Sequence, residues 1–348
     1  MPVTMPSNLI TALPGIIEAA DIDARRFAQD VLPTARPLLL RGLVGAWPAV
    51  AQGRKGAHAM AAYLKALDNG RPTTVLEASA VTQGRFTYGA DMRDFNFNRR
   101  HKSISAGLDD LLRALDHPNP PYIYIQSTPT PEHLPGFAAG NPNPLLPPAI
   151  APRIWISNAT RAQIHNDNDH NIACVAAGRR RFTLFPPEQV GNLYIGPMDH
   201  TPSGRAISLA SLEEPDFERF PKLAEALKYA QVAELEPGDA LYIPKYWWHH
   251  VQSQSPFNVL VNYWWGNSAS TADNPMTPFL AALLALKDVS PADKRYWKAM
   301  FDHYIFQTGE DPVAHIPQGH QGGLGPHNPR LRAEILKALQ GLVNAGAR

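Results

Sequence analysis

One cysteine is present among the 348 residues of the sequence. A single thiol excludes an internal disulfide and a zinc site made of several thiolates. This residue, Cys174, lies in the apolar run 172–176, where we expect a small buried side chain rather than a reactive nucleophile. A metal site in this chain would therefore use nitrogen and oxygen ligands.

Neither charge is in excess. Lysine and arginine together number 32, aspartate and glutamate number 31, and the net charge is +1. Because no global field would attract nucleic acid or an anionic membrane, we expect neither as a partner. We expect the partner in a pocket instead, as a protein or peptide substrate or as a small molecule.

Long apolar runs are absent as well. No stretch reaches the roughly 18 uninterrupted apolar residues that a membrane helix needs. Residues 1–10 lack the basic segment and apolar core of a leader peptide. We therefore expect a cytoplasmic protein.

Proline, in contrast, is abundant. The 34 prolines are roughly twice the average usage and favour a loop-rich fold that contains β-sheet. We expect three regions: an α+β region at 1–120 that packs on the core, a β core at 121–266, and a helical region at 267–348.

Short β-runs separated by Gly or Pro turns fill the middle region. The strands predicted there are 121–126, 153–157, 171–176, 181–185, 232–235, 240–243, 249–253 and 258–264. The other predicted elements are a strand and turn at 37–44, strands at 73–77 and 84–88, and helices at 58–67, 105–115, 277–286, 291–305 and 330–343. Many short strands at this spacing indicate a sandwich, jelly roll or barrel.

The most informative stretch is 163–171, which reads Gln-Ile-His-Asn-Asp-Asn-Asp-His-Asn. Its His165 and Asp167 are two residues apart, so on an extended chain both side chains point to the same face. With one more distant histidine they would form the 2-His-1-carboxylate set that binds non-haem Fe(II). Such pairs also occur by chance, and the alternative is two ordinary polar side chains.

A second stretch, 238–253, places His249 and His250 after two tryptophans and a Pro-Gly-Asp turn. Adjacent residues of a strand face opposite sides, so at most one of these histidines points toward His165. The alternative is a packed core edge with a hydrogen-bonded imidazole. The strand pattern leaves open which of the two histidines faces inward.

Several motifs in order resemble one family. They are His165-x-Asp167, the segment 178–187, and Pro-Gly-Asp-Ala-Leu-Tyr-Ile-Pro-x-x-Trp-Trp-His-His-Val at 237–251. Together they resemble the Jumonji-C and cupin-like 2-oxoglutarate-dependent oxygenases, and within that family most of all its asparaginyl hydroxylase branch. The resemblance covers about residues 120–266.

This resemblance implies a mainly β fold with flanking helices, whose core is a double-stranded β-helix, or jelly roll. It implies Fe(II) bound by His165, Asp167 and His249, while His250 faces away. It implies no catalytic side chain beyond these metal ligands. The cosubstrates would be 2-oxoglutarate and O2.

For 2-oxoglutarate the resemblance implies contacts from Tyr124, Asn171, Arg180 and Asn262. Arg180 stands where the family has a lysine, and a guanidinium can pair with the distal carboxylate of the cosubstrate. Ala162 replaces a family threonine, so one hydrogen bond to the cosubstrate is missing. Arg179 and Arg181 flank Arg180 and alternate with it in facing, so one or two of the three are expected to be surface charges.

The implied activity is hydroxylation of a C–H bond with release of succinate and CO2, on a protein or peptide side chain more than on a small metabolite. A demethylase outcome stays open, because a hydroxylated N-methyl group is lost. The alternatives are a catalytically silent cupin-like binding module and a metal-dependent cupin isomerase. The helices within 277–305 match a dimerisation segment of the family, which implies a homodimer.

Overall fold

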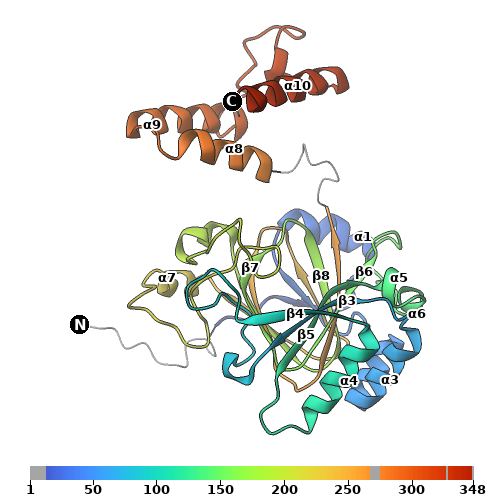
Figure 1. The fold of residues 1–348 in the computed structure, drawn as a ribbon. Coiled ribbons are helices and arrows are strands. Elements are labelled where there is room, and N and C mark those ends of the chain that lie inside the picture. Colours follow the sequence, from blue (N-terminus) through green and yellow to red (C-terminus); the bar gives the residue numbers. More distant parts are fainter. Residues whose placement is uncertain (1–12, 267–274, 327, 347–348) are drawn as a thin grey trace. The chain divides into compact units, whose positions relative to one another are not determined.

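The computed structural model describes residues 13–266, 275–326 and 328–346. The chain forms two compact units, Met1–Gly266 and Asn267–Arg348, and the strands of the described residues all belong to the first (Figure 1). The prediction that residues 1–10 form no leader peptide concerns residues outside the described ranges. None of the helices in the described ranges has the length and apolar character needed to cross a membrane.

Two sheets build the first unit. The smaller contains β7 (Arg161–Asn166), β9 (Arg180–Phe185), β10 (Gln231–Leu235) and β12 (Trp248–Ser253), in the order β10-β9-β12-β7. The larger contains β1 (Glu18–Ala19), β2 (Leu38–Leu40), β3 (Thr73–Ala78), β4 (Phe97–Lys102), β5 (Tyr122–Pro129), β6 (Pro152–Ser157), β8 (His170–Ala177), β11 (Ala240–Ile243) and β13 (Asn258–Trp265). Its order is β1-β2-β11-β8-β13-β6-β5-β3-β4.

The larger sheet has four central strands, in the order β11-β8-β13-β6, and the smaller sheet also has four. The two sets of four strands form the two sheets of the core. A shared apolar cluster joins the two sheets and includes Val175, Phe182, Leu241, Val251 and Leu260. These residues come from β8, β9, β11, β12 and β13, and side chains at alternate positions of each strand face this interior. The predicted fold class, a β-rich jelly roll with flanking helices, is confirmed.

Helices cover the outer face of the larger sheet (Figure 1). They are α2 (Pro48–Lys55), α3 (Ala57–Leu67) and α4 (Ile104–Leu115), with shorter helices α1 (Ala24–Arg26), α5 (Thr130–His133), α6 (Phe137–Gly140) and α7 (Leu223–Leu227) elsewhere in the unit. Glycine is needed at Gly53, where an added Cβ would lie 1.9 Å from the backbone oxygen of Ala176. This close approach lets α2 pack directly on β8.

One predicted strand is wrong, and three strands, β1, β4 and β7, were not predicted. Residues 84–88 form isolated bridges, Arg85 with Arg161 and Tyr88 with Phe95, and no continuous strand. Strand β4 carries the sequence Phe-Asn-Arg-Arg-His-Lys, which has no apolar alternation. It is an edge strand, and exposed charged residues are typical there.

The second unit is helical in its described residues. Its helices are α8 (Met276–Leu286), α9 (Pro291–Met300), which continues as a π-helical turn at Phe301–Ile305, and α10 (Pro329–Gly346). Helix α8 is apolar on all sides, yet none of its side chains is buried, and Leu284 is 90% exposed.

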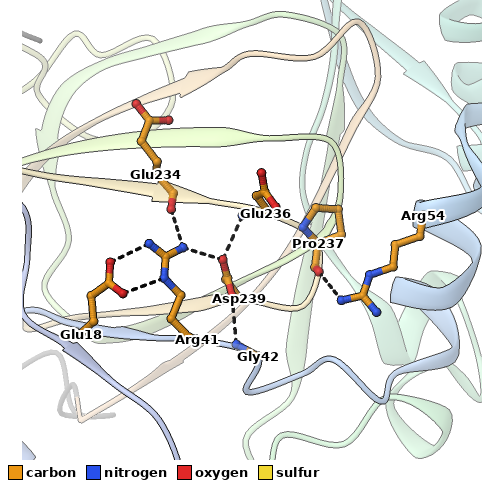
Figure 2. Close-up of polar contacts among 8 residues, drawn as sticks. All are labelled: Glu18, Arg41, Gly42, Arg54, Glu234, Glu236, Pro237 and Asp239. Atoms are coloured by element: carbon orange, nitrogen blue, oxygen red, sulfur yellow. Dashed lines mark hydrogen bonds and ion pairs between the residues drawn. The ribbon is translucent and has the colours of Figure 1, made fainter.

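A polar network fixes the turn that leads into β11 (Figure 2). Arg41, directly after β2, donates from Nη1 to Asp239 Oδ2 at 2.8 Å and from Nη2 to Glu18 Oε1 at 2.7 Å. Asp239 also accepts from the backbone N–H groups of Gly42 and Glu236, at 2.9 and 3.1 Å. One carboxylate therefore joins β2 to the Pro-Gly-Asp turn, and through it to the strands that follow.

We expect Asp239→Ala to lower the free energy of unfolding by about 2 kcal/mol, because three charge-assisted hydrogen bonds are lost at a side chain that is mostly buried. Urea unfolding followed by tryptophan fluorescence measures this. Glu18→Gln is the matched control, since its carboxylate is 53% exposed and an exposed ion pair contributes less than about 1 kcal/mol. Equal losses in the two variants would contradict this account of the network.

Candidate functional site

Two strands of the smaller sheet carry the histidines of the candidate site. Strands β7 and β12 pair antiparallel, with Trp248 opposite Asn166 and His249 opposite His165. Directly opposed residues have Cβ atoms ~4.5–5.5 Å apart. The two imidazole rings accordingly lie 4.3 Å apart between centroids. The register of one strand pair thus brings together two residues that are distant in the sequence.

Asp167 follows the last residue of β7. Its backbone oxygen accepts a 2.8 Å hydrogen bond from the N–H of Tyr246, which has a left-handed φ of 71° in the turn before β12. Its Oδ2 lies 3.8 Å from Nε2 of His249. One potential ligand atom from each of His165, Asp167 and His249 lies within 4.8 Å of the other two. Two imidazole nitrogens and one carboxylate oxygen are ligand types that suit Fe(II).

Both imidazoles are oriented by the backbone. Nδ1 of His165 lies 2.7 Å from the carbonyl of Gln163, and Nδ1 of His249 lies 3.0 Å from the carbonyl of Trp247. Since a carbonyl only accepts, each Nδ1 carries the proton and each Nε2 keeps its lone pair for a metal. Burial, with the neighbouring His165, lowers the pKa of His249 to about 4, so this ring is neutral near pH 7.

His250 points to the other side of β12. Its Nε2 lies 2.9 Å from Oε1 of Glu213. Burial opposes ionisation of Glu213, but the hydrogen bond and charge of His250 outweigh it and lower the pKa of this carboxyl to about 2. The two histidines thus have separate surroundings: His249 lies with His165 and Asp167, and His250 lies with a carboxylate.

A cavity of about 790 Å³ opens beside the three potential ligands. It is lined by all of the predicted site residues, namely Tyr124, His165, Asp167, Asn171, Arg180, His249 and Asn262. Ala162, the position where the family has a threonine, lines it as well. The structure therefore gathers every residue of the sequence-based hypothesis around one space.

Arg180 projects into this cavity from β9 and is only 2% exposed. Its Nε and Nη2 atoms are buried and have no hydrogen-bond partner within residues 13–266, 275–326 and 328–346. Burial lowers the pKa of Arg180 to about 10, which still leaves the guanidinium charged at neutral pH. A buried cation with unused N–H groups is costly unless an anion pairs with it, so this cavity fits a ligand carboxylate. Of its neighbours, Arg179 is exposed and Arg181 pairs with Glu234 at 3.3 Å.

The polar side chains opposite are linked to one another. Asn262 donates from Nδ2 to Oδ1 of Asn171 at 3.3 Å, and its Oδ1 accepts from Nε1 of Trp155 at 2.7 Å. Burial raises the pKa of Tyr124 to about 12, so its hydroxyl keeps the proton and can act as a donor. The hydrogen bonds among Trp155, Asn262 and Asn171 fix which side-chain atoms face a ligand in the cavity.

Four further arginines line the cavity, at positions 99, 153, 161 and 205, and were missed by sequence reasoning. Nε of Arg205 lies 3.5 Å from Oδ1 of Asp167, where it can orient this carboxylate. Arg99 and Arg153 line the same space from β4 and β6. The sequence carried no signal for them, because they come from four separate segments that only the fold brings to one opening.

Comparison with known proteins places this site in a family. Residues 24–271 match the model of the cupin-like domain. Relatives include lysine-specific demethylase JMJ31 of Arabidopsis thaliana, 37% identical over 32% of this chain and 20% of the relative, and Jumonji C domain-containing protein 5 of Drosophila melanogaster, 35% identical over 34% and 28%. The tRNA wybutosine-synthesizing protein 5 of Gallus gallus is 36% identical over 29% of each chain.

These alignments span less than a third of each relative's length, so they bear on the shared domain and not on the whole of any relative. The domain match is much broader. It takes in every strand of both sheets except β1, and every residue of the candidate site. With its jelly-roll core and its His-Asp-His group, the chain belongs to the cupin-like family that includes the Jumonji-C oxygenases.

Proposed function

We propose that this oxygenase-type protein is an Fe(II)- and 2-oxoglutarate-dependent dioxygenase that hydroxylates a C–H bond, with a protein or peptide side chain as substrate. The observation that carries the proposal is one cavity that holds both halves of such a site. His165, Asp167 and His249 offer three converging ligand atoms, and Arg180 offers a buried, unpaired cation. A structural metal site would have no use for such a cation.

The chain's own side chains have distinct tasks in this proposal. Two neutral imidazoles and one carboxylate would hold the metal on one face and leave the opposite face open. Arg180 would pair with the distal carboxylate of 2-oxoglutarate, and Tyr124 would donate a hydrogen bond beside it. With Fe(II), 2-oxoglutarate and O2 bound, such a site couples oxidative decarboxylation to succinate and CO2 with insertion of one oxygen atom into a substrate C–H bond.

Water exclusion is the remaining task. Much of the cavity wall is apolar or aromatic and includes Phe86, Phe97, Phe182, Leu260 and Trp264. Such a wall would keep solvent and stray polar groups away from the reacting carbon.

Two other outcomes would use the same residues, and a third would not. Removal of an N-methyl group requires the same hydroxylation step, and one relative is named a lysine-specific demethylase, so demethylation differs only in the substrate. A small metabolite would fit the cavity volume equally well. A silent binding module would have no need of three converging metal ligands.

We expect purified protein to release succinate from 2-oxoglutarate in the presence of Fe(II), ascorbate and O2, and His165→Ala or His249→Ala to lower this rate about a hundredfold or more. Each substitution removes one of three metal ligands. Coupled succinate detection measures the rate, and equilibrium dialysis measures bound Fe(II) independently of turnover. His58→Ala, at an exposed position on α3, is the matched control.

His250→Gln separates the adjacent histidines. Because His250 faces Glu213 and not the ligand group, we expect this variant to keep stoichiometric Fe(II) while His249→Ala loses it. The reverse result would place the third ligand at 250. Undiminished Fe(II) binding in both His165→Ala and His249→Ala would contradict the metal site itself.

We expect Arg180→Gln to weaken 2-oxoglutarate binding roughly 10- to 100-fold, because a charge-assisted pair with the distal carboxylate is lost. Calorimetric titration with Mn(II) in place of iron measures this affinity without turnover. Arg179→Gln removes the same charge from the exposed neighbour and should leave the affinity within about twofold of wild type. Equal effects of the two substitutions would disprove the assigned role of Arg180.

We also propose that the second unit pairs two copies of the chain. Helix α8 leaves Phe279, Leu280, Leu283 and Leu284 at 43–90% exposure, and apolar faces of this kind usually pack against a partner. Leu280→Asp with Leu284→Asp changes one face of α8, since the positions are one turn apart. We expect sedimentation velocity at micromolar concentration to show a dimer for wild type and for Lys287→Glu, and a monomer for the double variant. A wild-type monomer would refute the proposal.

A further inference from the structure

The cavity wall carries positive charge that the proposed chemistry does not use. Five arginines line it, at positions 99, 153, 161, 180 and 205, against two acidic residues, Asp167 and Asp169. The chain as a whole has a net charge of only +1. The excess of cations is therefore local, and a concave wall of one sign concentrates its field on whatever enters.

Three of these arginines have identified roles. Arg161 lies 3.7 Å from Glu213, and Arg205 lies 3.5 Å from Asp167. Arg180 is assigned to 2-oxoglutarate. Arg99 and Arg153 remain, and neither has a carboxylate within 4.0 Å anywhere in the part of the chain that the structure describes.

Arg153 is held in place by an irregular piece of backbone. The register between β5 and β6 shifts between Ile125 and Thr128, and Ser127 within this bulge has a left-handed φ of 46°. Ser127 accepts from Nε of Arg153 at 2.7 Å through its hydroxyl and from Nη2 at 2.5 Å through its backbone oxygen. The guanidinium carbon also lies 5.8 Å from the ring centre of Trp264.

A left-handed serine is unfavourable, and bulges beside sites re-aim side chains. The metal ligands do not require this bulge, because they lie on β7 and β12. It serves instead to present Arg153, which is half-buried, to the cavity.

Arg99 is fixed at the outer end of the same wall. Its guanidinium lies over the rings of Phe95 and Phe97, 5.2 and 5.6 Å from their centres, and donates to the backbone oxygen of Pro202. The rings of His200 and Phe97 both stack on Phe95, with ring centres 4.7 and 5.3 Å away. Exposure of the residues rises from Arg180 through Arg153 to Arg99, which places Arg99 at the mouth.

We propose that the substrate is a peptide with anionic side chains next to the hydroxylated residue, and that Arg153 and Arg99 bind these anions in turn. The inference rests on the proposed function, which supplies the reacting centre deeper in the cavity. A carboxylate and a phosphorylated hydroxyl share the required chemistry. A nucleic acid is less suited, because it needs many phosphate contacts over an extended basic surface, whereas the excess of arginines here is confined to one cavity.

Fluorescence anisotropy with three labelled peptide pools of equal length tests this inference. One pool carries Asp and Glu at its charged positions, one carries phosphoserine, and one carries Lys and Arg. The full chain is used with Mn(II) and 2-oxoglutarate, so that no turnover occurs. We expect an anionic pool to bind at least about tenfold more tightly than the basic pool, and Arg99→Gln and Arg153→Gln each to reduce that affinity about fivefold or more.

Arg100→Gln is the matched control. It removes the same charge one position along β4, where the side chain faces away from the cavity toward Glu77, and it should change binding less than twofold. Unchanged circular dichroism in all three variants separates lost contacts from lost folding. The better of the two anionic pools identifies whether carboxylate or phosphate is preferred.

Three results would overturn the inference: preference for the basic pool, equal or absent binding of all pools, or displacement of the anionic pool by a single-stranded RNA of equal charge at lower concentration. The readout does not depend on catalysis. Binding of an anionic pool without any succinate release would count against the dioxygenase proposal alone. Succinate release with a preference for the basic pool would count against the anionic substrate alone.

Discussion

The pairing of β7 with β12 is the constraint on which the site depends. Because His165 and His249 are directly opposed across this pair, their separation follows from the geometry of an antiparallel sheet and not from flexible side-chain reach. A slip of one residue would send His249 to the opposite face and His250 inward. The turn at Tyr246, bound to the backbone of Asp167, closes the same pair at the strand ends and brings the carboxylate to the two rings.

The rest of the first unit keeps β7 and β12 in register. It also places the carboxylate of Asp167 and the guanidinium of Arg180 at different positions around the same cavity. Strand β11 enters the turn before β12, and the network of Arg41 and Asp239 fixes the start of β11 against β2. The imidazoles of His165 and His249 lie beside the carboxylate of Asp167, while Arg180 stands in the same cavity as a buried cation. Burying such a cation is costly, and pairing with the carboxylate of a ligand would offset this cost.

Local sequence patterns predicted the elements that are apolar or alternate in polarity. Most core strands were placed within a few residues, and the H-x-D and His-His motifs gave the ligand candidates. Strands β4 and β7 were not predicted because polar and charged residues occupy most of their positions. Segment 84–88 was wrongly predicted because its β-forming residues make isolated bridges and not a continuous strand. Sequence patterns of apolar residues indicate which side chains are buried. They identify a strand only where burial and strand pairing coincide, and in these segments the two do not coincide.

The sequence by itself determined the residue types of the site, the alternation that makes His249 and His250 face opposite sides, and the family to which these motifs belong. Tertiary structure alone decided which of the two histidines faces His165, because that depends on the register between strands distant in the sequence. It also decided that Nε and Nη2 of Arg180 are buried with no hydrogen-bond partner among the described residues, and that Arg99, Arg153 and Arg205 reach the same cavity. Contacts between distant segments leave no local pattern, so charge at a shared opening becomes visible only once the chain is folded.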